Sequence, residues 1–432
     1  MTKTFFFTTV LLLAPAWGQT PLSSTDGDPK QRVRQIRDQA KLGEDGIAGI
    51  APFVSDADLN VRIEAAKALV AIGGPKTLDP LLRAIGDNDP EVQIRATDGL
   101  VNVYLPGYTK SGLSGTLSRA GTSIRGKFTD TNDQVIDPYV QVRPEVVTAL
   151  GKLVRGGASM DARGNAARAV GVLRGRAAIP ELVDSLRSKD DKLMYESLVA
   201  IGKIGDPAAA PRITFLLRDL DERIQSQALE ITGLLHNKAA APQVRDAFRV
   251  ARTPKVKASA LTALAMLADP ADHAIFVSAL VDKEESVRAA AAEGLGRIKF
   301  AADRTVLEPI FMNERGMNPR LSQAFALVNL GDISPERFAP LRYLVNTLNQ
   351  RAYRGVANAF LIELARTDGV RQAIYPMLMG ATRDEKTQIC GVLAQSGQAD
   401  SVTYLETLSK DSDPEVATEG IRSLRVLRSR LR

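Results

Sequence analysis

The stretch from Asp56 to Gly73, DADLNVRIEAAKALVAIG, decides the fold of this chain. Its apolar residues recur at helical spacing and form one stripe along a helix: Val61, Ala65, Ala68, Leu69 and Ile72. Asp58 has a side chain that is typical of a helix N-cap, and Gly73 is a typical residue just after a helix. The stretch therefore predicts one amphipathic helix with its own start and stop signals.

Related stretches repeat along most of the chain. With Val61 as the reference position, further helices are predicted to begin near Val92, Ala162, Leu193, Ile224, Val256, Val287, Pro319, Tyr353, Glu385 and Val416. Neighbouring copies lie 31 to 34 residues apart, except for one step of 70 residues. A second, shorter apolar pattern separates consecutive copies, as at residues 77–85 and 179–186. Each repeat is therefore predicted to be a helix-turn-helix hairpin.

A single hairpin of this kind cannot bury its apolar stripe alone, so neighbouring hairpins must stack into one continuous core. No segment shows the alternation that is typical of a β-strand. We therefore predict an all-α, right-handed α-solenoid of about eleven helix-turn-helix hairpins over residues 28–432.

The repeated pattern D-x-D-x-x-V-R-x-x-A-x-x-A-L-x-x-I-G resembles HEAT repeats, specifically the short bacterial type named after phycobilin lyases. The resemblance covers roughly Asp28 to Arg432 and is strongest at residues 56–73, 87–100, 190–205 and 282–298. It implies an armadillo-like helical superhelix that is used for protein binding, and it implies little about chemistry.

The first residues, MTKTFFFTTVLLLAPAWGQT, have the pattern of a secretory signal peptide. Lys3 precedes an apolar run from Phe5 to Leu13, and small residues follow around a cleavage point before Gln19. We expect a signal peptide at 1–18, a flexible segment at 19–27, and an exported protein that is periplasmic or extracellular.

Composition excludes some classes of function. The formal charge of +6 is a mild excess, and the charges are interspersed, so we predict no nucleic-acid partner. Cys390 is the only cysteine and lies among apolar residues of a predicted helix, which indicates a buried and inert thiol.

The long step between Val92 and Ala162 contains an insertion at residues 106–139 that lacks helical periodicity. Such a loop either contacts a partner or is a tolerated insertion, and we expect it to project from one edge of the array. The residues within it that suit partner contact are Tyr108, Lys110, Arg119, Arg125, Lys127 and Phe128. Residues 121–127 have the spacing of a phosphate-binding loop, but Phe128 stands where the magnesium-binding hydroxyl belongs, so we predict no nucleotide site.

Two further rows of residues recur with the repeats. Arg62 has basic equivalents in later copies, which either bind an acidic partner or form a ladder with the acidic turns of neighbouring repeats, and the ladder is favoured. A second helix face carries Ile63 and Val70, with Phe325 among its equivalents. This face is either a groove for a partner segment or a surface for close stacking, and Phe325 is our nominated partner contact on it.

Enzymatic chemistry has little support in the sequence. His236 and His273 are the only histidines and lack metal-binding spacing, and no cysteine–histidine pair suggests a nucleophile. HEAT-like hydroxylases need several His-Glu pairs for iron, which are missing here, and no bilin-binding residue can be identified. We therefore predict no catalytic residue, no metal and no cofactor.

The predicted function is that of an exported, non-catalytic scaffold, which binds another protein through its curved helical surface and the 106–139 loop. One alternative is an enzyme or enzyme accessory related to HEAT-like lyases or hydroxylases. A second alternative is attachment to an anionic envelope surface through the tail at 421–432, which carries five arginines at helical spacing. The partner and the oligomeric state stay open.

Overall fold

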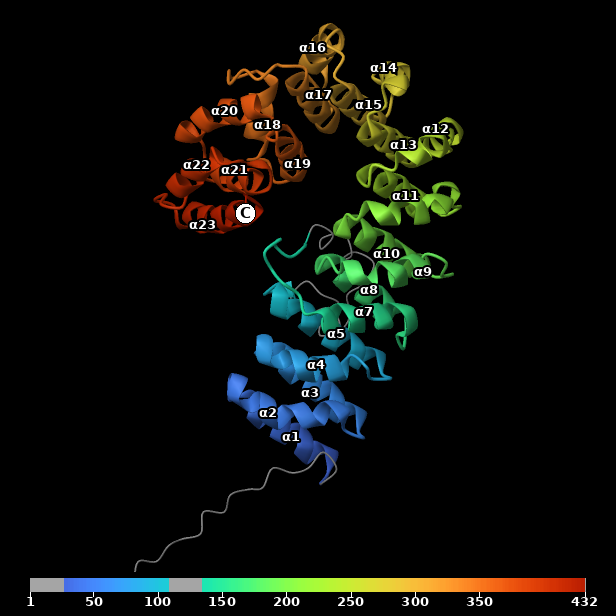
Figure 1. Cartoon of the computed structure of the whole chain (residues 1–432), viewed down its shortest axis with the longest axis vertical. Helices are drawn as coiled ribbons and strands as arrows, with labels where there is room; N and C mark the ends of the chain where they lie inside the picture. Colours follow the sequence, from blue (N-terminus) through green and yellow to red (C-terminus); the bar gives the residue numbers. More distant parts are fainter. Residues whose placement is uncertain (1–26, 109–133, 432) are drawn as a thin grey trace, which may run out of the picture.

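The computed structural model describes residues 27–108 and 134–431, and within these ranges it contains 22 α-helices and no β-strand (Figure 1). The prediction of an all-α solenoid is confirmed. A helix is present at every one of the predicted repeat positions: α3 (Leu59–Ile72), α5 (Pro90–Tyr104), α8 (Met160–Val172), α10 (Asp191–Ile204), α11 (Glu222–Leu234), α13 (Pro254–Leu267), α15 (Glu285–Ile298), α17 (Met317–Asn329), α19 (Arg354–Leu364), α21 (Arg383–Ser396) and α23 (Pro414–Leu431).

A further helical segment precedes each of these helices and completes its hairpin, and it is shorter in every repeat except that of α7 and α8, which are equally long. These segments are α2 (Ile47–Ile50) with η2 (Ala51–Ser55), α4 (Leu78–Ala84), α7 (Pro144–Gly156), α9 (Ile179–Ser185), η7 (Pro207–Arg212) with η8 (Thr214–Arg218), α12 (Ala241–Val250), α14 (His273–Ala279), α16 (Asp303–Asn313), α18 (Pro340–Thr347), α20 (Asp368–Ile374) with η11 (Tyr375–Gly380), and α22 (Ser401–Leu408). One additional helix, α1 (Pro29–Ala40), packs against α3 at the N-terminal end.

The acidic turns start the helices as the sequence predicts. The Asp58 carboxylate accepts hydrogen bonds from the backbone N–H groups of Asn60 (2.9 Å) and Val61 (3.2 Å), and Asp89 does the same for α5. These bonds satisfy N–H groups that have no partner within the helix. Local capping therefore sets the repeat boundaries along the chain.

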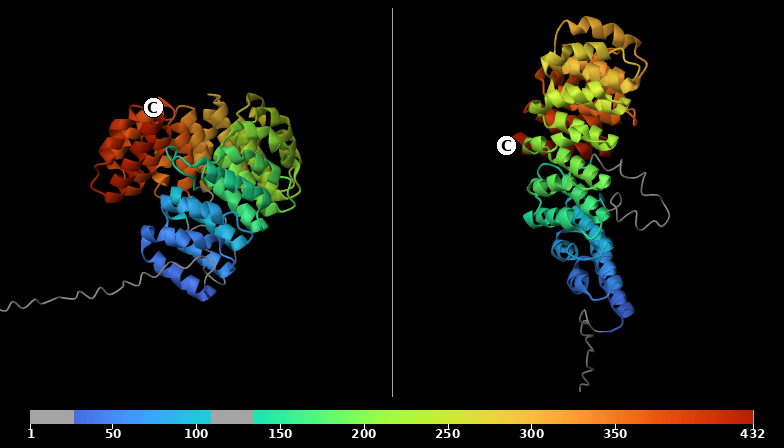
Figure 2. Two further views of the ribbon diagram at one scale, coloured as in Figure 1. Left: turned by 60° about the horizontal axis from the view of Figure 1, so that its bottom comes forward. Right: turned by 90° about the vertical axis from the view of Figure 1, so that its right-hand side faces the viewer.

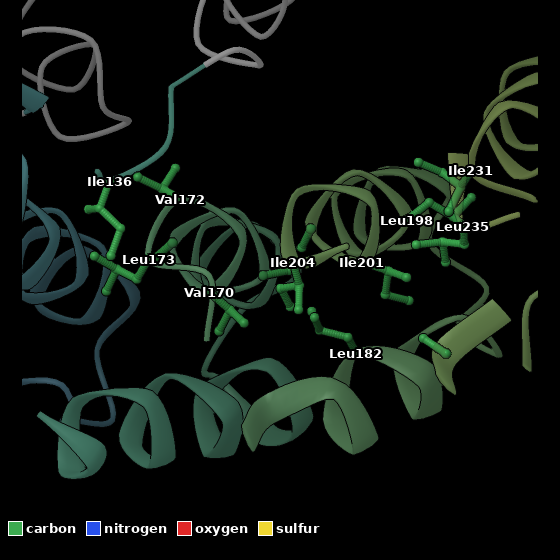
Figure 3. Packing of buried hydrophobic residues seen from close by; sticks show 14 of the residues in the cluster. Ile136, Val170, Val172, Leu173, Leu182, Leu198, Ile201, Ile204, Ile231 and Leu235 are labelled. Carbon is green, nitrogen blue, oxygen red and sulfur yellow. The ribbon is translucent and has the colours of Figure 1, made fainter. Parts of the chain in front are cut away.

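The apolar stripes of all hairpins merge into one core. A single cluster of buried hydrophobic residues extends from Ile36 to Leu427, so no repeat has a separate core. Figure 3 shows a part of it, where Leu182 of α9 lies close to Ile201 and Ile204 of α10. This continuity is what a solenoid requires, because each repeat covers the apolar face of the next.

Small residues let the longer helices of neighbouring repeats approach closely. A Cβ atom at Gly171 would lie 2.7 Å from the backbone of Ala200, and one at Gly296 would lie 2.6 Å from the backbone of Ala326. Residues on the second helix face, such as Val101 and Phe325, are buried in these contacts. The stacking interpretation of this face is therefore the one that the packing supports.

The chain follows a curved path, and its C-terminal repeats return toward the repeats in the middle of the chain. Repeats from α1 to α5 extend away, whereas those from α8 onward curve so that α9, α12, α14 and α16 lie outside and α10, α13, α15 and α17 lie inside (Figure 1). The last helix, α23, comes back toward the repeats around α8, and the two further views agree (Figure 2). The helices inside this curve surround an interior that is described below.

Candidate protein-interaction surface

The insertion enters and leaves on the inner side of the curve. Tyr108 and Ile136, at its two described ends, are both buried in the common core. Ile136 lies beside Val172 of α8 (Figure 3). The backbone N–H of Ile136 donates to the carbonyl of Val172 at 3.0 Å, and Lys203 Nζ donates to the carbonyl of Gln134 at 3.2 Å. The expected projection from one edge therefore does not hold for the ends of the insertion, and its middle, residues 109–133, lies outside the described residues.

The segment after the insertion also contacts the C-terminal helix. Arg422 of α23 donates two hydrogen bonds to the Asp137 carboxylate, at 2.6 Å and 3.2 Å, across 285 residues of sequence. The Arg425 guanidinium lies over the Tyr139 ring, 5.8 Å from its centroid. The hydrogen bond to the Asp137 carboxylate raises the pKa of Arg422 and outweighs burial, which lowers it. We name residues 134–140 the closing segment, because their contact with α23 joins the C-terminal helix to the repeats around α8.

A buried polar network lies on the inner helices beside the closing segment. Arg168 of α8 forms a two-bond ion pair with Glu196 of α10, at 2.7 Å and 3.2 Å, and Asn165 donates to Asp98 of α5 at 2.9 Å. Burial raises the pKa of the Tyr108 phenol, and the nearby Asp98 carboxylate adds to this effect. Buried charges must be paired to be tolerated, so this network fixes how α5, α8 and α10 stack.

The row of basic residues forms the predicted ladder. Arg62 pairs with Asp87 of the next acidic turn at 2.6 Å, Lys257 pairs with Asp282 at 2.6 Å, and equivalent pairs join Arg288 to Glu314, Arg354 to Asp384 and Lys386 to Asp411. Two copies depart from the ladder, since Arg163 donates to a carbonyl at 2.8 Å and Arg320 stacks on Phe311 and Tyr343. These ion pairs neutralise basic side chains that could otherwise bind an acidic partner.

The nominated partner contacts have different outcomes. Tyr108 is 1% exposed and Phe325 is 0% exposed, with Phe325 stacked on Phe360 at a centroid distance of 4.6 Å and capped by Arg297. Both rings fill the core between repeats, so neither can contact a partner in this structure. The prediction of these two partner contacts is therefore wrong, because the stacking of the helices buries both rings. The other five nominated residues lie outside the described residues: Lys110, Arg119, Arg125, Lys127 and Phe128.

The arginines of the C-terminal tail are largely engaged within the protein. Besides Arg422 and Arg425, Arg428 pairs with Glu406 at 2.6 Å, and Arg430 donates to the carbonyls of Ala394 and Gly397. Arg432 lies outside the described residues. Two of these arginines, Arg422 and Arg428, are therefore paired with carboxylates and are less available to an anionic surface.

The groups that could carry chemistry are sparse in the described ranges. No cluster of three metal-binding side chains occurs there, and His273 pairs with Asp303 at 2.8 Å. Cys390 is fully buried, which confirms the prediction of a buried thiol, and this burial raises the pKa of the thiol to about 12. No helix among the described residues has the length and apolar character needed to cross a bilayer.

Two cavities open on the interior of the curve. The first, of about 360 Å³, lies between the closing segment and the helices α21 and α23, with Arg174, Arg422 and Arg430 in its lining. The second, of about 510 Å³, lies between the C-terminal ends of α11 to α17 and helix α19. The ion pair of Arg297 with Glu363 joins α15 to α19 at this second cavity. Neither cavity was predicted from the sequence, because each is lined by repeats that are distant in the chain.

A family model of HEAT repeats matches residues 21–101 and 147–232. These two regions consist of HEAT repeats, and the described residues form an α-solenoid. The resemblance predicted from the acidic turns and the Val-Arg pairs is thus confirmed, and the gap between the matched regions coincides with the insertion. No curated protein sequence matches the chain.

Some solved structures are similar to this chain over most of its length. Kap121p bound to Nup53p has 12% identity and a TM-score of 0.41, with 94% of this chain and 52% of that chain covered. A chain from work on the interaction between cadherin and beta-catenin has 15% identity, a TM-score of 0.40 and coverage of 94% and 99%. The complex of CpcE and CpcF of phycocyanin lyase from Nostoc sp. PCC7120 has 16% identity, a TM-score of 0.32 and coverage of 85% and 97%. These likenesses concern the fold alone.

Proposed function

We propose that this protein is an exported, non-catalytic scaffold that holds a partner protein in the interior of its closed superhelix. The observation that carries the proposal is the contact of Arg422 with Asp137, which brings α23 to the closing segment. Closure turns an open concave surface into an interior that is bordered by inner helices on several sides (Figure 1). A partner segment there would be contacted from several directions, which favours a long residence time.

The ladder and the core support the same proposal. The ion pairs between repeats and the buried Arg168–Glu196 pair hold neighbouring repeats together. The C-terminal ends of the inner helices take no part in these pairs, so their surface is available to a partner. Repeat proteins bind partners on extended concave surfaces of this kind. The insertion belongs to the proposed binding region, because both of its described ends lie on the inner side.

The binding site is testable by photo-crosslinking with p-benzoylphenylalanine at single positions. Ala359 is exposed and lines the larger interior cavity, whereas Phe215 is exposed on the outer segment η8. Incorporation at Ala359 is expected to give a discrete crosslinked partner in the native envelope fraction, and incorporation at Phe215 is expected to give none. Crosslinks from Phe215 alone would place the partner outside the interior and contradict the proposal.

Export is tested separately by N-terminal sequencing of the protein made with its first segment intact. Cleavage before Gln19 is the expected result, with the mature chain recovered outside the cytoplasm. A control variant with charged residues in place of Leu11 and Leu12 should keep the first segment, since the apolar run is then interrupted. An uncleaved cytoplasmic wild-type protein would reject the exported location and leave the scaffold proposal in place.

A further inference from the structure

One backbone position recurs at the C-terminal ends of the inner helices. The residues there adopt left-handed φ angles and are spaced by 31 or 32 residues: Arg174 (48°), Gly205 (68°), His236 (51°), Ala268 (51°), Lys299 (62°) and Gly331 (98°). Glycine adopts this conformation freely, whereas other residues are strained in it. Glycine occurs at two of these positions, so the repeat can accommodate it there. The presence of strained basic residues at three other positions therefore requires its own explanation.

The strained basic residues line the interior cavities. Arg174 lines the cavity next to the closing segment, and His236 and Lys299 line the larger one. A cation at a helix C-terminus complements the helix dipole, which explains a part of this preference. The dipole does not explain why further cations approach from the opposite wall.

Arg366 and Arg430 are the cations on that opposite wall. Arg366, just after α19, lines the larger cavity, and Arg430 of α23 lines the smaller one. Burial lowers the pKa of Arg430, and the positive charge of nearby Arg366 lowers it further. Each of the two cavities therefore has an arginine on this wall.

The carboxylates around these cavities are already paired. Asp137 and Glu419 both bind Arg422, and Glu363 binds Arg297. Within the described parts of the chain, no ion pair involves any of four remaining lining cations: Arg174, Lys299, Arg366 and Arg430. An excess of positive charge that faces an enclosed space is a site for an anionic ligand.

We propose that this interior binds an acidic segment of a partner protein, with Arg174 and Arg430 as carboxylate-binding residues in the smaller cavity and Lys299 and Arg366 in the larger one. The inference rests on the proposed scaffold function and names the chemistry of its partner. A peptide fits better than a small anion because apolar side chains, among them Met266, Ile362 and Val426, line the cavities together with the cations. Glutamate and aspartate side chains would accept charge-assisted hydrogen bonds from the guanidinium groups.

The test uses the full chain and a fluorescein-labelled oligoglutamate peptide, with an oligoglutamine peptide of equal length as the probe control. Fluorescence anisotropy at low salt is expected to detect the glutamate peptide only. The double variant R366Q/R430Q should weaken binding by about tenfold or more, because two charge-assisted contacts are lost. The matched variant R212Q/R252Q has the same net charge and changes exposed arginines that line neither cavity, so it should bind as the wild type does.

Equal binding by both double variants would mean a diffuse effect of net charge and would overturn the inference. Binding of a sulfated oligosaccharide in place of the peptide would also overturn it. The variant K299Q provides a second measurement if R366Q/R430Q does not fold. Interior crosslinking at Ala359 without any preference for oligoglutamate would reject the acidic partner while the scaffold proposal stands.

Discussion

Asp87 shows how one acidic turn serves two repeats. One of its carboxylate oxygens accepts the backbone N–H of Asp89 at 2.8 Å, which shapes the turn, while the carboxylate also binds Arg62 of the preceding repeat. The next acid, Asp89, caps the following helix. The recurrence of this pattern makes the charged residues of the motif structural, and a charged pattern in a repeat protein therefore does not by itself indicate a binding site.

The ladder predicts a loss of stability in acid. Lys257 and the backbone N–H of Glu284 lower the pKa of Asp282, and Lys386 does the same for Asp411. A carboxylate whose pKa is lowered by folding stabilises the folded state above its unfolded value of about 4 and loses this effect as the pH falls through the lowered value. Thermal unfolding between pH 6 and pH 2.5 should show this decrease, and K257M should show a smaller decrease than the wild type. An equal decrease in both proteins would exclude this pair as a contributor.

The buried pair of Arg168 with Glu196 should respond strongly to the loss of one partner. E196Q leaves the guanidinium buried without its counter-charge, and such losses cost about 3–5 kcal/mol. The double variant R168M/E196L removes both charges and should recover much of that stability. Urea unfolding of the three proteins measures the difference, with R212M as a surface control. A double variant no more stable than E196Q would contradict this account.

Cys390 should be unreactive in the folded protein. Its thiol is buried and its pKa is raised to about 12, so near pH 8 a reagent cannot reach the thiol and the thiol is not deprotonated. A thiol-reactive chromogenic reagent is expected to label the chain in urea and to leave it unlabelled in native buffer. Rapid native labelling would show that α21 opens locally.

The insertion illustrates how an element without helical periodicity can still be structural at its ends. Tyr108 and Ile136 lie in the common core, and their backbone and side chains border α8. Composition predicts only a polar loop here, because glycine, serine and threonine dominate the stretch and hide the two apolar anchors. The ends of the insertion are therefore part of the fold.

Two deletions should separate the structural and the binding contributions of the insertion. Removing 106–139 takes out the two buried anchors and should destabilise the array by several kcal/mol, as losses of large core side chains do. Replacing only 109–133 with a glycine-serine linker of equal length keeps the anchors and should leave the melting temperature nearly unchanged. If the insertion contacts the partner, crosslinking from Ala359 should fall in the second variant. An equally stable protein after both changes would contradict the role of the anchors.

Closure of the superhelix depends on a small and partly exposed contact. Arg422 is 54% exposed and Asp137 is 21% exposed in their ion pair, so the pair is open to screening by salt. Exposed pairs contribute at most about 1 kcal/mol, which makes closure easy to reverse. Entry of a partner segment into the interior requires such reversibility.

Opening is therefore expected on a single substitution. D137N should increase the radius of gyration in small-angle X-ray scattering, and the wild type should expand in the same direction at high salt. E406Q removes a different ion pair of the same helix, that of Glu406 with Arg428, and should leave the radius unchanged. A D137N protein with the wild-type radius would show that apolar contacts of Ile136 and Val426 suffice for closure.

The sequence by itself determined the repeat, the helix boundaries and the stacking, because caps, proline positions and apolar stripes act within a few residues of one another. It also contained an unused signal, the recurrence every 31 or 32 residues of a helix-end position at which basic residues alternate with glycine or alanine. Only the tertiary structure decided that Phe325 and Tyr108 are buried, that α23 reaches residues 134–140, and that Arg366 and Arg430 line interior cavities. These outcomes depend on the curvature accumulated over many repeats, since a small rotation at each interface decides which distant residues come together.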